Sequence, residues 1–88
     1  ATSRWALGRT FAWRGGGWID PRYHAGMREL VVRSMSDAYF ALLRARPELR
    51  EALALGERVI VTLDDGRAII VAPDSGETST EEVTRFCE

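Results

Sequence analysis

Residues 56–73 read GERVIVTLDDGRAIIVAP, and this stretch decides the fold. Two runs of β-branched and apolar residues, 59–63 and 68–72, flank the turn sequence Asp-Asp-Gly-Arg. An Asp-Gly pair between such runs predicts a β-hairpin, because glycine accepts the positive φ of a tight turn. Both runs are apolar on both faces, so we expect the hairpin to lie centrally, covered on each side. Pro73 ends the second strand, since proline cannot donate to a sheet.

The segment before the hairpin predicts a pair of helices. Apolar residues recur at helical spacing over residues 36–45 and again over 47–55. Either Ser34 or Ser36 can cap the first helix through its side-chain oxygen. Pro47 divides the pair, because proline costs about 3 kcal/mol inside a helix but suits the first position of a new one. We therefore expect a Pro-broken helix pair packed on the sheet.

Three further strands are predicted upstream of the helix pair. We expect strands near residues 9–14, 18–23, 28–33, 58–63 and 67–72. Residues 1–72 then form one α+β module with a small antiparallel sheet or a partly open barrel of about five strands. Its order is strand, strand, strand, helix pair, strand, strand. Residues 73–88 predict a polar acidic tail, with capping-box spacing for a terminal helical turn between Ser79 and Glu82.

Composition describes an ordinary globular chain. Its 88 residues are 45% apolar and 28% charged. No apolar run approaches the ~20 residues that span a bilayer, so we expect no membrane insertion. Residues 1–50 contain nine arginines and four acidic residues, whereas residues 51–88 contain three and nine. This dipolar pattern favours contacts with protein neighbours over a dedicated polyanion site.

The sequence predicts no catalytic, cofactor-binding or metal-binding residue. Cys87 and His24 are the only residues of their types, so neither an internal disulfide nor a metal-ligand cluster is indicated. A Ser-His-Asp arrangement would need His24, and no serine lies in a GxSxG elbow. Asp64 and Asp65 are typical of a turn rather than an acid–base pair. An enzyme with His24 as general base is the least favoured hypothesis.

Residues 9–19, RTFAWRGGGWI, contain the most distinctive surface pattern. The glycines predict a turn that places the two tryptophans opposite each other, with the phenylalanine on the same face. The candidate interaction surface comprises Phe11, Trp13, Arg14, Trp18 and Arg22. We expect this face to be buried or docked on a partner. The alternative is that it stacks nucleic-acid bases, as in an oligonucleotide-binding barrel, which has the same strand order.

Five short motifs of the chain form a recognisable set. They are G-R-T-F at residues 8–11, W-I-D at 18–20, S-D-A-Y-F-A-L-L at 36–43, P-E-L at 47–49 and A-L-G-E-R-V at 54–59. Together they resemble a carboxy-terminal module of bacterial proteins with a vault/inter-α-trypsin domain and a von Willebrand factor type A domain. The resemblance implies an accessory module, not an enzyme. The D-x-S-x-S metal motif of type A domains is absent from this sequence, so no metal residue carries over.

These observations favour a non-catalytic interaction module without a cofactor. The chain begins at Ala1 without a methionine, so we expect it to be either processed or cut from a longer protein, and we favour the second explanation. Its expected partners are other domains of that parent chain or a second copy of itself. Nucleic-acid binding remains the alternative.

Overall fold

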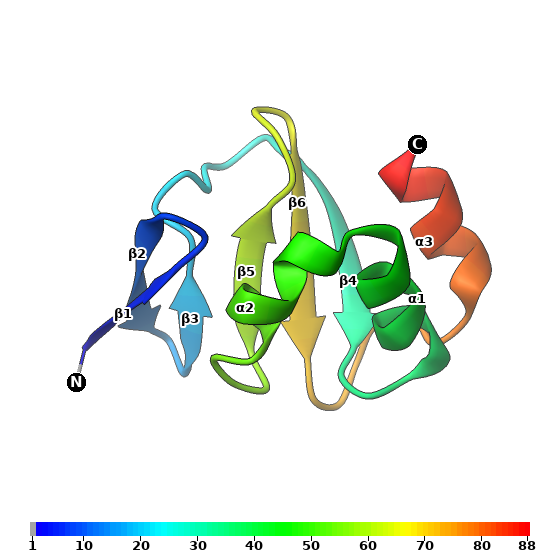
Figure 1. The fold of residues 1–88 in the computed structure, drawn as a ribbon, viewed down its shortest axis with the longest axis horizontal. Helices are drawn as coiled ribbons and strands as arrows, with labels where there is room; N and C mark the ends of the chain where they lie inside the picture. The colour runs from blue at the N-terminus through cyan, green and yellow to red at the C-terminus, as the bar shows by residue number, and fades with distance from the viewer. Residues whose placement is uncertain (1) are drawn as a thin grey trace.

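The computed structural model describes residues 2–88 and shows an α+β fold, with helices packed on one face of a six-stranded sheet (Figure 1). The strands are β1 (Ser3–Ala6), β2 (Arg9–Arg14), β3 (Gly17–Ile19), β4 (Arg28–Arg33), β5 (Val59–Thr62) and β6 (Arg67–Ala72). The helices are α1 (Asp37–Ala45), α2 (Arg50–Leu53) and α3 (Thr80–Cys87), with a 3-10 turn, η1 (Pro47–Leu49), between α1 and α2. The predicted fold class is confirmed, as an open sheet rather than a barrel.

The sheet is mixed, where an antiparallel sheet was predicted. Its strand order is β1-β2-β3-β5-β6-β4, so the β5–β6 hairpin lies between β3 and β4. The β3–β5 and β4–β6 pairs are parallel. The cause is the path of the chain, which leaves β3 through residues 20–27 and crosses the end of the sheet to its far edge (Figure 1).

One strand, β1, was not predicted. It pairs antiparallel with β2 through a two-residue turn, Leu7-Gly8, in which both residues have positive φ. Such a turn matches the twist of the flanking strands. Most of β1 is exposed, including Trp5 at 68% of its surface. A strand that buries so little shows no alternation of apolar residues, which explains why the sequence pattern did not indicate it.

The core lies on the helix-covered face of the sheet. The central hairpin directs Val59, Val61, Ile69 and Val71 into it, and all four are almost fully buried. Helix α1 packs over β4 and α2 over β5. Helices cover this face alone within residues 2–88, so the expectation of cover on both sides of the hairpin is wrong for the described chain.

The helix pair forms as predicted. Ser36, rather than Ser34, caps α1 by accepting a hydrogen bond from the Tyr39 N–H. Pro47 stands at the first position of η1. None of the helices within residues 2–88 has both the length and the apolar character to cross a membrane.

Residues 73–88, predicted as a polar tail, belong to the folded domain. Glu77 exchanges backbone hydrogen bonds with Val31 and Arg33 of the edge strand β4. Helix α3 packs beside α1 and buries Val83 and Phe86. Val83 and Phe86 are three positions apart and therefore share one face of the helix. Their burial holds an otherwise charged helix against α1.

Candidate interaction surface

The five predicted surface residues do not form one surface. Phe11 is fully buried and Trp18 nearly so, because both point towards the helix layer. Trp13 pairs with Trp18 across β2 and β3 as predicted, with ring centroids 5.1 Å apart, and remains 47% exposed. Arg14 extends from the opposite face of the sheet, and Arg22 lies in the turn after β3. The structure therefore brings the rings of the two tryptophans together and directs Arg14 and Arg22 elsewhere.

Trp18 is held from several sides. The guanidinium of Arg4 lies 5.2 Å from its ring centroid. Gly56 approaches so closely that a Cβ atom there would sit 3.3 Å from the indole. Enclosed in this way, Trp18 cannot offer its ring face to a nucleic-acid base, as the stacking alternative requires.

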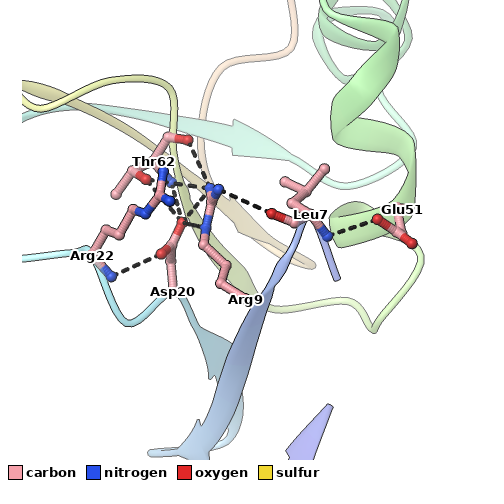
Figure 2. Close-up of polar contacts among 6 residues, drawn as sticks. All are labelled: Leu7, Arg9, Asp20, Arg22, Glu51 and Thr62. Atoms are coloured by element: carbon pink, nitrogen blue, oxygen red, sulfur yellow. Dashed lines mark hydrogen bonds and ion pairs between the residues drawn. The ribbon is translucent and has the colours of Figure 1, made fainter. Parts of the chain in front are cut away.

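A buried carboxylate, Asp20, organises the end of the sheet next to these residues (Figure 2). Its Oδ2 accepts hydrogen bonds from Arg9 Nη2 at 2.7 Å, Arg9 Nε at 3.0 Å, and the N–H and hydroxyl of Thr62 at 2.9 Å each. Its Oδ1 accepts from the backbone N–H of Arg22 at 2.8 Å. Burial alone would raise the pKa of Asp20, but these hydrogen bonds together hold it below its ordinary value.

The Asp20 cluster ties three strands of the sheet together. Arg9 belongs to β2, Asp20 follows β3 and Thr62 ends β5, so one carboxylate joins three strands. The Leu7 N–H in the neighbouring turn donates to Glu51 of α2 at 2.7 Å, which ties the outer hairpin to the helix layer (Figure 2). Sequence reasoning missed this cluster. The sequence signal that could have indicated it is the pair Asp20-Pro21 directly after a strand. An Asp-Pro pair favours a turn in which the aspartate side chain accepts a hydrogen bond from a backbone N–H two residues later.

The other residues considered for catalysis or metal binding are His24, Asp64 and Cys87. His24 is exposed, and its hollow is lined by arginine, aspartate, threonine and leucine side chains, with neither serine nor cysteine among them. Asp64 closes its turn by accepting from Gly66 N and Arg67 Nε at 2.9 Å each. Burial raises the pKa of the Cys87 thiol. Residues 2–88 contain no cluster of three potential metal ligands.

The uncovered face of the sheet presents a continuous apolar row. The strand registers align Ala12, Ile19, Ile60, Ile70 and Val31 from β2 through β4. All five are half-buried, flanked by neighbours on the sheet and open to solvent above. A hollow of about 300 Å³ lies over Ile19, Ile60 and Ile70. We call this row the open-face row.

Three exposed arginines border one side of the open-face row. Arg14 and Arg58 line the hollow itself. Arg33 follows on β4, paired in register with Ala72. Arg58 makes one loose ion pair, 3.9 Å from Asp74, with both side chains well exposed. The open face thus combines an aliphatic centre with a basic rim.

Comparisons with known proteins give this surface no assignment, since no family model, curated protein or solved structure matches the chain.

Proposed function

We propose that the chain is a non-catalytic interaction module that docks through its open-face row onto a neighbouring folded domain of the same polypeptide. The open-face row is the observation that carries this proposal. An antiparallel or mixed sheet that faces water normally alternates apolar residues inside with polar residues outside. Here Ile19, Ile60 and Ile70 occupy the solvent side of three adjacent strands. Contiguous apolar surface of this kind marks an interaction site.

The size of the face favours a domain of the same chain over a stable dimer. Six strands about 4.8 Å apart and about five residues long present a face of roughly 400 Å². Stable interfaces between separate proteins bury roughly 800 Å² per partner. Interfaces between domains of one chain bury roughly 300–750 Å² per side. A tethered partner also needs less affinity, because the linker supplies an effective concentration near the millimolar range.

The basic rim defines the chemistry of the partner. Arg14, Arg33 and Arg58 border an aliphatic centre, so a complementary surface carries aliphatic side chains with acidic residues along one edge. The resemblance of residues 8–72 to the accessory module of von Willebrand factor type A proteins supports the same proposal. Such a module lies beside a folded domain on which it can dock.

The test uses two double variants of the open-face row whose replacement side chains, threonine and valine, match each other in shape. The double variant Ile60→Thr/Ile70→Thr places hydroxyls on this face, whereas Ile60→Val/Ile70→Val has the same shape and remains apolar. Calorimetry measures binding of each variant to the separately expressed remainder of the parent polypeptide. We expect a Kd between about 10 μM and 1 mM for the native chain and the valine variant, and at least about tenfold weaker binding for the threonine variant.

Three results would overturn the proposal. Equal affinities of the threonine and valine variants would remove the open-face row from the interface. A dimer in sedimentation velocity that only the threonine variant disrupts would assign the face to self-association. Binding of single-stranded DNA that weakens with salt and is lost on replacing Arg14 and Arg58 would favour the nucleic-acid alternative.

A further inference from the structure

A second apolar surface lies on the outer side of the helix layer, away from the sheet. A groove of about 560 Å³ follows α1 and η1. Its lining residues are Met35, Tyr39, Phe40, Leu43, Arg44, Pro47 and Arg50. We call it the α1 groove. The sheet separates it from the open-face row, so the two surfaces can act independently.

The α1 groove exposes large apolar side chains that the fold does not need for its core. Met35 is 68% exposed and Phe40 is 45% exposed. Met35 also has a φ of 64°, which costs a non-glycine residue about 1–2 kcal/mol. Its backbone is fixed on both sides, by Ser34 N–H to Ala72 O at 2.8 Å and by Ser36 Oγ to Arg33 O at 2.7 Å. The Met35 side chain is therefore presented to solvent by a rigid frame.

The groove residues follow the length of helix α1. Tyr39, which is mostly buried, and Leu43 stand one turn apart on α1, while Met35 precedes the helix and Pro47 opens η1 after it. They form an apolar ridge along the length of the helix, and an extended surface of this kind suits the apolar face of a second helix. Phe40 stands beside this ridge, with its ring 5.2 Å from that of Tyr39 in an edge contact. Methionine adapts its shape to different partners and is common at helix-binding surfaces.

Charge identifies the occupant. Arg44 and Arg50 line the groove, and neither takes part in an ion pair within residues 2–88. Two unpaired guanidinium groups beside an apolar ridge complement carboxylates that border an apolar face. We propose that the α1 groove binds an amphipathic helix with acidic residues beside its apolar face. The module then holds one partner on its sheet and a second on its helix layer.

The test identifies the preferred peptide sequence by selection from a random library. A displayed library of random peptides, about 14 residues long to allow four helical turns, is selected against the 88-residue chain. We expect enriched peptides to carry apolar residues at helical spacing together with Asp or Glu. Fluorescence anisotropy then measures the Kd of one selected peptide carrying a fluorescent label. We expect Phe40→Ala and Met35→Ser each to weaken its binding at least about tenfold.

Two controls separate this proposal from the one above. The Ile60→Thr/Ile70→Thr variant leaves the α1 groove intact and should bind the selected peptide like the native chain. Arg44→Glu/Arg50→Glu should instead prefer the same peptide with lysines in place of its acidic residues. Circular dichroism confirms that each variant is folded.

Several outcomes would overturn the proposal. Selected peptides without apolar residues at helical spacing or without acidic residues would exclude this occupant. Selected peptides that bind Phe40→Ala and Met35→Ser as tightly as the native chain would exclude it as well. Binding to phosphatidylserine vesicles that depends on Phe40, without any selected peptide, would assign the groove to a lipid surface. Concentration-dependent dimerisation lost on Phe40→Ala would assign it to a second copy of the chain.

Discussion

Arg9 and Asp20 meet at the end of the β2–β3 hairpin, with 2.7 Å between Nη2 and Oδ2, and the side chain of Asp20 has no exposed surface. Replacing Arg9 with Ala leaves this carboxylate buried with only its Thr62 and backbone donors. A buried charge deprived of its partner is costly, so we expect Arg9→Ala to lower the free energy of unfolding by about 3 kcal/mol. Urea denaturation followed by tryptophan fluorescence measures this loss.

The matched control for Arg9 is Arg46, whose Nε lies the same 2.7 Å from Glu48 but at the surface. Exposed ion pairs contribute little, so Arg46→Ala should cost less than about 1 kcal/mol. Equal costs for the two substitutions would show that the Asp20 cluster adds no more than a surface pair.

Acid should destabilise the fold through the same carboxylate. The pKa of Asp20 is lower in the folded chain than its ordinary value of 3.8. The unfolded chain therefore binds the proton more tightly, and stability present above about pH 4 is lost as the pH falls through the folded-state pKa. In Asp20→Asn this acid-dependent loss should shrink. Urea midpoints of both proteins between about pH 2 and pH 7 test it, and parallel curves would contradict the assignment.

Gly76 should be the least replaceable glycine of the chain. It has a φ of 106°, and a Cβ there would lie 2.8 Å from both Cγ1 and the backbone oxygen of Val31. Gly76→Ala must therefore displace the segment that pairs with β4, and we expect a loss of about 3 kcal/mol. Gly26 has a similar φ of 96° with nothing within 4 Å of its Cβ position. Gly26→Ala should cost only about 1 kcal/mol, and thermal melts of both variants separate crowding from backbone strain.

Helix α3 should be required for stability. Phe86 is buried and is covered by the guanidinium of Arg28, 5.4 Å from its ring centroid. Removing such a side chain costs about 3–5 kcal/mol, so Phe86→Ala should unfold at markedly lower urea concentration. Phe40→Ala removes the same atoms from an exposed position and should shift stability by less than about 1 kcal/mol. An unchanged midpoint for Phe86→Ala would mean that α3 is not part of the cooperative unit.

Local patterns predicted much of this fold. The β5–β6 hairpin follows from the Asp-Gly turn and its apolar flanks, and the break between α1 and α2 follows from Pro47, because both depend on residues adjacent in sequence. The parallel pairing of β3 with β5 depends on where a long connection places the chain, which no local pattern records.

The candidate surfaces illustrate the same limit. Phe11 and Trp18 were assigned to the candidate interaction surface because they are aromatic, but both are buried in the core. The open-face row could not be predicted, because Ile19, Ile60 and Ile70 become neighbours only once the register of three strands is fixed. The Arg9–Asp20–Thr62 cluster was missed for the same reason, since 42 positions separate Asp20 from Thr62.

The insertion of the β5–β6 hairpin between β3 and β4 also governs when this domain can form during synthesis. The neighbour of β4 in the sheet is β6, so residues 28–33 can form their strand pairing only after residues 67–72 have been synthesised. A nascent chain ending before residue 67 lacks β6, which lies between β5 and β4 in the sheet, and therefore leaves the apolar side chains of β4 without their strand partner. Such long-range pairing slows folding and exposes the unfinished chain to aggregation. Formation of the full sheet is therefore a late step, and a chain truncated before residue 67 should not form a stable domain.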